Sequence, residues 1–434
     1  MKISRYIIIS LLLCLSIAVS GCGEKKALPE DESMSVQTTD KKENIELKLW
    51  TFFNGWSHQI QGFNTIYPEI NITVENFGFD ELKNEYIKAL SEGNGPDILV
   101  MDSSFFGQYT VNGVLENLLE EPYSAGKYEK DFPKDVWDSN KSVDNKSVLA
   151  MTFLTSPGVT FYRADVMEEN GFPSEPDEFG RFIENPENLI AIAKKLKLKD
   201  QYIFQWPTDL PVLLGSSVGF FDENLKFVRN SDEFVKVLNI AKNVHKSGFE
   251  LEAGFWSEAG KKAVQDGKLV MVSNLGSWGA SIIESYAPEQ AGKWRVTKPP
   301  LGIKAWASDT RLAINSQSKN KEWAWKFIEY IATHQNRSEN IDMVTGYIQA
   351  RRNPNLMKRS NTFFGGQIVQ PLFEDLGENM VQYRMTPLDD KAREIFDKEI
   401  TDAIVMNIDS EKAIKDIADE IESSLAEERE ILLQ

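Results

Sequence analysis

Cysteine and histidine are scarce in this chain. Its 434 residues include two cysteines, Cys14 and Cys22, and three histidines, His58, His245 and His334. No cysteine follows Cys22, which excludes disulfides, thiolate metal sites and a cysteine nucleophile from the rest of the chain. The histidines have neither HxxH nor HExxH spacing. The sequence therefore predicts no metal site, no cofactor and no catalytic residue that depends on these side chains.

Positive charge is also in short supply. The chain has 48 Lys and Arg residues against 66 Asp and Glu residues, and its formal net charge is −18. Nucleic-acid binding needs a basic face that neutralises phosphates, so this class of partner is excluded, and a basic membrane-binding patch is not expected. With 41% hydrophobic and 26% charged residues the chain is globular, and its length suffices for two or three domains.

Long apolar runs are confined to the N-terminus. In "MKISRYIIISLLLCLSIAVSGC", two basic residues precede an apolar run over 6–19, and small residues precede Cys22. This layout is typical of a secretory signal, and the run is short for a transmembrane helix. The residues "VSGC" resemble a bacterial lipobox, which implies cleavage after residue 21 and lipidation of Cys22. An ordinary secretory signal with a chance cysteine is the alternative.

Residues 23–44 show no apolar periodicity and mix charged residues with Ser and Thr. Such a composition predicts a flexible tether, which together with the lipidated Cys22 spans 22–44. We therefore expect a signal peptide at 1–21 and a folded body held by lipid at the extracellular face of the cell membrane.

The body begins with alternating strand and helix patterns. Residues 45–49 and 70–77 alternate apolar and polar positions, and 97–102 form a short apolar run that suits a parallel strand covered on both faces. Between them, helical spacing runs over 57–67, with Ser57 as a possible cap, and over 80–92. This βαβαβ order predicts an α/β fold with a ligand crevice beyond the carboxyl ends of the strands.

The same alternation continues more irregularly along the rest of the chain. We expect helices at 187–198, 232–247 and 320–333, an acidic amphipathic surface helix from Ala413 to the end, and strands at 269–272 and 311–315. A Gly-Ser-Trp turn follows the first of these two strands. Trp323 and Trp325 lie two apart on a helix and therefore face in different directions, one toward the core and one toward the surface.

Seven segments in order resemble family-1 extracellular solute-binding proteins of sugar ABC importers, the family of maltose-binding-protein-like lipoproteins. They include "LKLWTFFN", "GNGPDILVMD", "GVTFYRADVMEENGF", "AVQDGKLVMVSNLGSW" and "TGYIQARR", and the resemblance covers most of residues 45–430. The resemblance implies a type II fold of two α/β lobes, each a mainly parallel sheet flanked by helices, joined by hinge strands. Mapped onto this chain, one lobe is 45–152 plus 311–347, and the other is 153–310 plus 348–434.

The resemblance also implies a function. The chain is expected to bind a sugar, with its many aromatics favouring an oligosaccharide, in the cleft between the lobes. It would act as a monomer and deliver the sugar to ABC transporter permease subunits by hinge closure, without chemistry of its own.

A sugar cleft needs flat aromatic rings for the CH faces of the sugar and planar polar groups for its hydroxyls. Candidates by this criterion, by place at strand ends or by family resemblance are Trp50, Asn54, Trp56, Asp102, Ser103, Trp206, Trp256, Trp278, Trp306, Tyr347 and Arg351. Three of these residues have an alternative structural role. Trp50 could pack in the core, Asp102 could cap a helix, and Arg351 could pair with surface carboxylates.

Two other classes of protein are weighed against this one. "GSSVG" at 215–219 matches the G-x-S-x-G nucleophile elbow of hydrolases, but that motif requires a preceding strand and a following helix. A lipid-anchored glycoside hydrolase would need two carboxylates flanking the scissile bond, and no pair stands out among the 66 acidic residues. A sugar-sensing surface lipoprotein is the third class.

Overall fold

The computed structural model describes residues 45–111, 113–333 and 343–434, together with the backbone but not the side chain of Asn274. The predicted signal peptide, the lipidation site at Cys22 and the tether lie outside the described residues. Within the described part of the chain, no helix is both long enough and apolar enough to cross a membrane.

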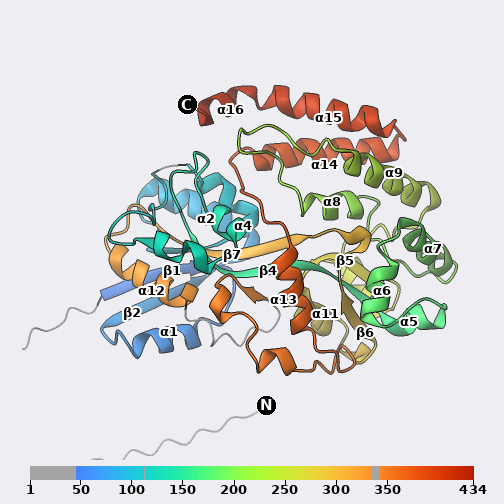
Figure 1. Cartoon of the computed structure of the whole chain (residues 1–434), viewed down its shortest axis with the longest axis horizontal. Coiled ribbons are helices and arrows are strands. Elements are labelled where there is room, and N and C mark those ends of the chain that lie inside the picture. The colour runs from blue at the N-terminus through green and yellow to red at the C-terminus, as the bar shows by residue number, and fades with distance from the viewer. Residues whose placement is uncertain (1–44, 112, 334–342) are drawn as a thin grey trace, which may run out of the picture. The chain divides into compact units, whose positions relative to one another are not determined.

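A single mixed sheet runs through the middle of the body (Figure 1). Its strands follow the order β2 (Ile70–Asn76), β1 (Ile45–Thr51), β3 (Ile98–Asp102), β7 (Trp306–Ile314), β4 (Met151–Arg163) and β5 (Met271–Gly276). Two further strands, β6 (Trp294–Thr297) and β8 (Val344–Thr345), pair with β4. Strand β1 is parallel to β2 and to β3, whereas β3–β7 and all pairings of β4 are antiparallel.

The predicted βαβαβ unit is confirmed at the start of the body. Strand β1 buries Leu47 and Leu49 on one face, as its alternation predicts, and the connecting helices are α1 (Ser57–Asn64) and α2 (Phe79–Glu92). Helix α1 ends earlier than expected, and Ser57 lies inside it and does not cap it. Gly93 ends α2 with φ of 73°, a left-handed conformation that glycine adopts without strain.

Strands β4 and β7 connect the two halves of the sheet. The first part of β4 pairs with β7, while its last residues pair with β5 and β6. Strand β7 in turn pairs with β3 on its other side. The predicted lobe boundaries at 152/153 and 310/311 thus fall inside two strands that pass from one half of the sheet to the other.

The expectation of a mainly parallel sheet in each lobe is wrong for the half built on β4, β5 and β6. Parallel pairing in that half, within the described residues, is limited to isolated bridges between Tyr202 and Leu269 and between Phe204 and Glu250. The strand expected at 269–272 is observed at Met271–Gly276, and Leu269 makes only an isolated bridge. A short apolar run indicates a buried strand but does not encode the direction of its partner, so sequence alone missed this arrangement.

Helices cover both halves of the sheet (Figure 1). They are α3 (Ser103–Phe106), α4 (Lys134–Asp138), α5 (Ala164–Glu169), α6 (Pro176–Phe182), α7 (Pro186–Lys197), α8 (Asp209–Gly215), α9 (Asp232–Ser247), α10 (Glu258–Gln265), α11 (Gly279–Tyr286), α12 (Lys321–Thr333), α13 (Gln370–Asn379), α14 (Asp389–Val405), α15 (Ser410–Ser424) and α16 (Ala426–Leu432). The helices expected at 187–198, 232–247 and 320–333 are confirmed within one residue at each end.

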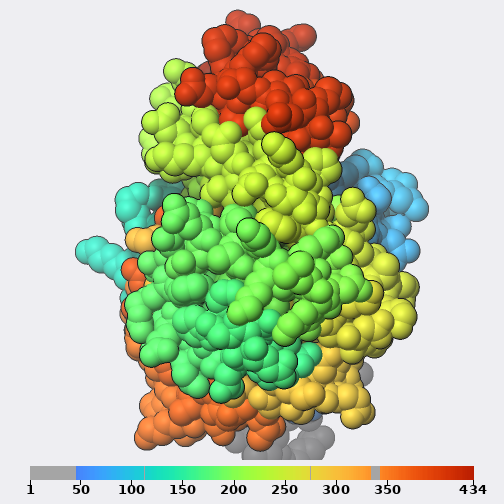
Figure 2. Space-filling view, turned by 90° about the vertical axis from the view of Figure 1, so that its right-hand side faces the viewer, coloured from blue at the N-terminus to red at the C-terminus, as the bar shows by residue number. Residues whose placement is uncertain are grey.

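The C-terminal helices pack on the middle of the chain. Helix α15 buries Ile414, Ile417 and Ile421 in a core shared with α9 and α14, and its opposite face is exposed. Figure 2 shows these C-terminal helices (red) lying over α9 (yellow-green). The amphipathic surface helix predicted from Ala413 is thereby confirmed, but it begins at Ser410 and is interrupted at Leu425, after which α16 follows.

Candidate functional site

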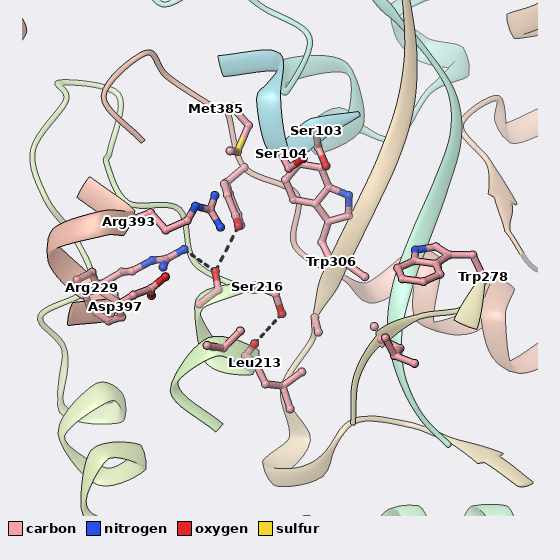
Figure 3. A pocket seen from close by; sticks show the side chains of 18 residues that line it. Ser103, Ser104, Leu213, Ser216, Arg229, Trp278, Trp306, Met385, Arg393 and Asp397 are labelled. Atoms are coloured by element: carbon pink, nitrogen blue, oxygen red, sulfur yellow. Dashed lines mark hydrogen bonds between the residues drawn. The ribbon is translucent and has the colours of Figure 1, made fainter. Parts of the chain in front are cut away.

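A solvent-open pocket lies beside the point where β4 and β7 pass each other (Figure 3). Its walls come from the segment after β3, from β4, α8, the β5–α11 turn, the start of β7 and the segment leading into α14. The lining residues are Ser103, Ser104, Gly158, Val212, Leu213, Gly215, Ser216, Arg229, Leu275, Trp278, Ala305, Trp306, Ala307, Tyr383, Met385, Arg393, Phe396 and Asp397. Both halves of the sheet therefore contribute to one site.

The floor of the pocket depends on close contact between two backbones. Gly158 of β4 donates its N–H to the carbonyl of Ala305 at 2.8 Å, and a Cβ on Gly158 would lie 2.5 Å from the Cβ of Ala305. A side chain at position 158 would thus push the strands apart. The N–H of Trp306 donates to the carbonyl of Ser216 at 2.8 Å, which ties the end of α8 to β7.

Trp278 forms the aromatic wall at one end of the pocket (Figure 3). The residue follows β5 and immediately precedes α11, and its half-buried ring packs against Leu275 and the surrounding core. Its indole Nε1 donates to Ser308 Oγ at 3.1 Å. A Cβ on Gly276 would lie 2.4 Å from that Nε1, so glycine at position 276 makes room for the indole. The ring is therefore held in place before any ligand arrives.

Trp306 and Tyr383 form a second aromatic group. Their ring centroids are 5.0 Å apart with an edge-to-face geometry, and Met380 and Met385 complete this small cluster. The indole Nε1 of Trp306 is buried and has no hydrogen-bond partner among the residues that the structure describes. An unsatisfied buried donor is unusual, and at a pocket wall it suits an acceptor that comes with a ligand.

The polar groups on the β3 side come from the strand end. Asp102 Oδ1 accepts a hydrogen bond from the N–H of Ser104 at 2.8 Å and so caps α3, and burial raises the pKa of Asp102 to about 6. Ser103 Oγ accepts from the N–H of Asp309 at 3.3 Å and lines the pocket. The alternative interpretation of Asp102 as a helix cap is thus confirmed.

A charged wall faces the tryptophans across the pocket (Figure 3). Arg229 is 6% exposed, and its guanidinium donates to the carbonyls of Val218 and Gly215 and stacks 3.6 Å above the ring of Phe220. Burial lowers the pKa of Arg229, while burial raises the pKa of Asp397, an effect opposed by Arg393 and Arg229. The pocket thus has positively charged donors, Arg229 and Arg393, and a carboxylate acceptor, Asp397, on the side opposite the tryptophans.

The structure brings three of the predicted residues, Ser103, Trp278 and Trp306, to this pocket. Trp206 and Trp256 do not line it, but both are exposed, and Trp256 stacks on Trp278 with ring centroids 5.7 Å apart. The aromatic wall of the pocket therefore continues outward along Trp256.

Two predicted cleft tryptophans lie in the core instead. Trp56 is 3% exposed, packs against Phe53 and Phe153, and donates its Nε1 to Thr51 Oγ1 at 3.1 Å. Its indole nitrogen is satisfied inside the protein, which explains how a tryptophan can lie buried beside a turn. The half-buried Trp50 stacks on Tyr86 and packs against Phe77 at a tilt, under α2. The structure therefore agrees with core packing, the alternative left open for Trp50.

The other three candidates lie on the surface or in contacts away from the pocket. Asn54 is exposed and accepts a hydrogen bond from Asn76 at 2.6 Å. Tyr347 packs against Phe132, and Arg351 donates from Nε to the carbonyl of Thr345 at 2.9 Å. Arg351 therefore has a backbone partner in place of the expected sugar hydroxyl or surface carboxylate.

Most of the charged wall was missed by sequence reasoning. Arg229 is far in the chain from Tyr383, Arg393 and Asp397, which lie on α14 or just before it, and none of the four belongs to a motif. The one available signal was the Gly-Ser stretch at 215–217, which ends α8 at the pocket.

The nucleophile-elbow match at 215–219 does not have the geometry of an elbow. A helix, α8, precedes it, and a turn closed by the bridge between Phe221 and Phe227 follows it. Ser217 Oγ donates to the carbonyl of Leu214 at 2.9 Å. Among the side chains that the structure describes, no group of three or more His, Cys, Asp and Glu is placed to hold a metal ion.

Comparison with known proteins identifies the class. The fold is the two-lobe, type II fold of periplasmic sugar-binding proteins, as in the galacto-N-biose-/lacto-N-biose I-binding protein of a Bifidobacterium longum ABC transporter. That structure superimposes with a TM-score of 0.72 at 16% identity, covering 90% of this chain and 98% of the other.

The family model described as bacterial extracellular solute-binding protein matches residues 59–358, and the chain belongs to this family. Two curated relatives are named arabinooligosaccharide-binding proteins. The one from Halalkalibacterium halodurans is 23% identical over 84% of this chain and 87% of its own length. The one from Bacillus subtilis is 22% identical over 78% of each.

Proposed function

We propose that this protein is the lipid-anchored substrate-binding protein of an ABC importer and that it binds an oligosaccharide in the pocket between its lobes. The ligand would stack on Trp278 and contact the edge of Trp306, which is 3% exposed, and its hydroxyls would meet Ser103, Arg229 and Asp397. The names of the two curated relatives make arabino-oligosaccharides the first ligands to test.

The observation that carries the proposal is the fixed, half-buried ring of Trp278 opposite a charged wall. A sugar ring is apolar on its CH faces and polar along its rim, so it can contact both walls at once. Because the indole is already held by Ser308, stacking on it loses little conformational entropy. The buried Nε1 of Trp306 would gain an acceptor from the ligand.

Delivery of the sugar is proposed to depend on rotation of the lobes 45–152 plus 311–347 and 153–310 plus 348–434. Strands β4 and β7 contain the boundaries 152/153 and 310/311, so we expect these two strands, with the third crossing at 347/348, to act as the hinge. A ligand that contacts both lobes favours the closed state by its differential affinity. The permease subunits would recognise that state, with the protein acting as a monomer.

The membrane anchor is proposed from the sequence alone. The lipobox-like residues before Cys22 would direct cleavage and lipidation, and 22–44 would tether the body to the extracellular face of the membrane. Replacement of Cys22 with Ser should abolish incorporation of a labelled fatty acid into the protein, and unchanged incorporation would contradict the anchor.

We also propose that the protein does no chemistry. Both curated relatives are binding proteins by name, and the helix before Gly215 argues against a nucleophile elbow. A lipid-anchored glycoside hydrolase and a sugar-sensing lipoprotein are the competing functions.

One assay separates binding from hydrolysis. The full-length protein is titrated with arabino-oligosaccharides while tryptophan fluorescence and reducing ends are followed. Saturable fluorescence change with intact sugar supports the proposal, whereas release of reducing ends contradicts it. Uptake of labelled sugar by cells that lack the protein separates transport from sensing, because only a transport protein is required for uptake.

A further inference from the structure

The exposed tryptophans of the body gather at one place. All ten tryptophans of the chain lie within the described residues, and only Trp206 at 43% and Trp256 at 60% are exposed. Large aromatic rings are normally buried, so a pair of exposed tryptophans on one part of a surface indicates a contact with something else.

Trp256 extends the aromatic wall of the pocket. Its ring stacks on that of Trp278 at an interplanar angle of 27° and a centroid distance of 5.7 Å. Trp278 lines the pocket and Trp256 does not. The two rings are therefore in direct contact, one in the pocket wall and the other exposed to solvent.

Trp206 and Val212 lie on the neighbouring segment. A Cβ on Gly254 would lie 3.2 Å from the indole Nε1 of Trp206, which places that ring against the loop that carries Trp256. Helix α8 follows Trp206 and presents Val212, which is 49% exposed and lines the pocket. We call the two exposed tryptophans, Trp206 and Trp256, the aromatic rim of the pocket, and the apolar side chain of Val212 lies beside them.

The backbone that carries the rim is fixed by hydrogen bonds. Gln205 Oε1 accepts from the N–H of Phe255 at 2.6 Å, and the carbonyl of Gln205 accepts from the N–H of Glu252 at 3.0 Å. The carboxylate of Asp209 accepts from the N–H groups of Gln205 and Trp206 at 2.7 and 3.3 Å. The segments of Trp206 and Trp256 are thus held to one another, and their exposed rings are in place before a partner binds.

We propose that the aromatic rim is an outer subsite for an oligosaccharide whose end lies in the pocket. The inference rests on the proposed function and extends it: the ligand is longer than a disaccharide, and its outer units stack on Trp256 and Trp206. Continuity of Trp256 with Trp278 is the reason for choosing the same saccharide as the occupant over a separate protein partner. Exposed indole faces offer no charge and match the apolar faces of successive sugar rings.

The test is calorimetric titration of the full-length protein and of its Trp256→Ala and Trp206→Ala variants. Each is titrated with an arabino-disaccharide and with a longer oligosaccharide of the same series. We expect each variant to bind the longer ligand about tenfold more weakly than the unmodified protein and to bind the disaccharide with unchanged affinity. Trp323→Ala is the matched control, because its half-buried ring lies on α12 against Tyr67, away from the pocket.

The outcomes separate this inference from the proposed function. If the unmodified protein binds no saccharide, the proposed function fails and the outer subsite fails with it. If it binds saccharides but both variants retain normal affinity for the longer ligand, the rim is not a subsite. Impaired sugar uptake by such variants would then assign the rim to a contact with the transporter. An equal loss of both ligands would also overturn the inference, because the rim would then act only by supporting the pocket.

Discussion

Asp309 and Arg311 form a fully buried ion pair two residues apart on β7. Arg311 donates from Nε and from a terminal nitrogen to the two carboxylate oxygens of Asp309, each at 2.7 Å, and both side chains are 0% exposed. The guanidinium also reaches Ser139 and lies 4.5 Å above the ring of Phe106. The pair thus lies inside one of the two strands that join the halves of the sheet.

Removing the acid of this pair should destabilise the body strongly. Asp309→Asn leaves a buried guanidinium without its counter-charge, and we expect the free energy of unfolding to fall by about 3–5 kcal/mol. Guanidinium chloride unfolding of the variant measures it. The exposed pair of Lys415 and Asp419 provides the control, since Asp419→Asn should leave the unfolding midpoint unchanged. Equal effects of the two substitutions would contradict this account of the pair.

Loss of the Trp56 side chain should mainly reduce stability, whereas loss of the Trp278 side chain should mainly reduce sugar affinity. Trp56→Ala opens a cavity in the core, so the free energy of unfolding should fall by about 3–5 kcal/mol while the folded fraction keeps normal sugar affinity. Trp278→Ala should weaken sugar binding more than tenfold, equivalent to ~1.4 kcal/mol or more, and should lower the free energy of unfolding less than Trp56→Ala does, because its ring is only half-buried. Titration and thermal unfolding of both variants provide the comparison, and the reverse assignment would show that Trp278 serves the core.

The position of the Trp278 indole should depend on Gly276. In Gly276→Ala the new methyl group would lie 2.4 Å from both the Trp278 Nε1 and Ser156 Oγ, so the indole has to move. We expect a loss of sugar affinity of about tenfold. Gly126→Ala is a matched control, because its nearest atom would be an ordinary contact at 3.6 Å. Calorimetric titration measures both, and normal affinity in Gly276→Ala would show that the indole position does not matter.

Stability should fall as pH rises because of Asp209. Burial raises the pKa of Asp209 from its ordinary 3.8 to about 7, so the folded state keeps a proton that the unfolded state releases between these values. The folded state therefore loses about 1.4 kcal/mol of relative stability for each pH unit inside this window and nothing more above it.

The substitution Asp209→Asn tests whether stability falls with rising pH because of this carboxyl group. Its amide is neutral, so the decline of unfolding free energy between about pH 4 and about pH 7 should become shallower. The decline should not vanish, because burial also raises the pKa of Asp102 and Asp389 to about 6. An unchanged pH profile in denaturant unfolding would contradict the raised pKa of Asp209.

The sequence was most informative where a local period reflects burial. The alternation around Leu47 and Leu49 and the helical spacing up to Gly93 were enough to predict the first βαβαβ unit. The antiparallel pairings of β4 were beyond reach, because strand direction depends on partners distant in the chain. The Gly-Ser-Trp turn placed Trp278 correctly at the pocket through its family resemblance.

The rest of the site depends on tertiary contacts that no local pattern encodes. Trp56 follows a turn as a cleft residue would, yet Thr51 offers its indole an acceptor inside the core. Arg229 and Tyr383 come from distant segments, yet both donate to the carbonyl of Gly215. Such contacts form only in the folded chain, and neither composition nor residue spacing predicts them.

Sugar binding in the pocket lined by Trp278 can be measured by calorimetric titration of the full-length protein with a series of arabino-oligosaccharides and other oligosaccharides. We expect saturable binding of one ligand per chain, recovery of the sugar intact, and a loss of more than tenfold in affinity in Trp278→Ala. Absence of binding to every oligosaccharide, or full affinity in Trp278→Ala, would contradict this expectation.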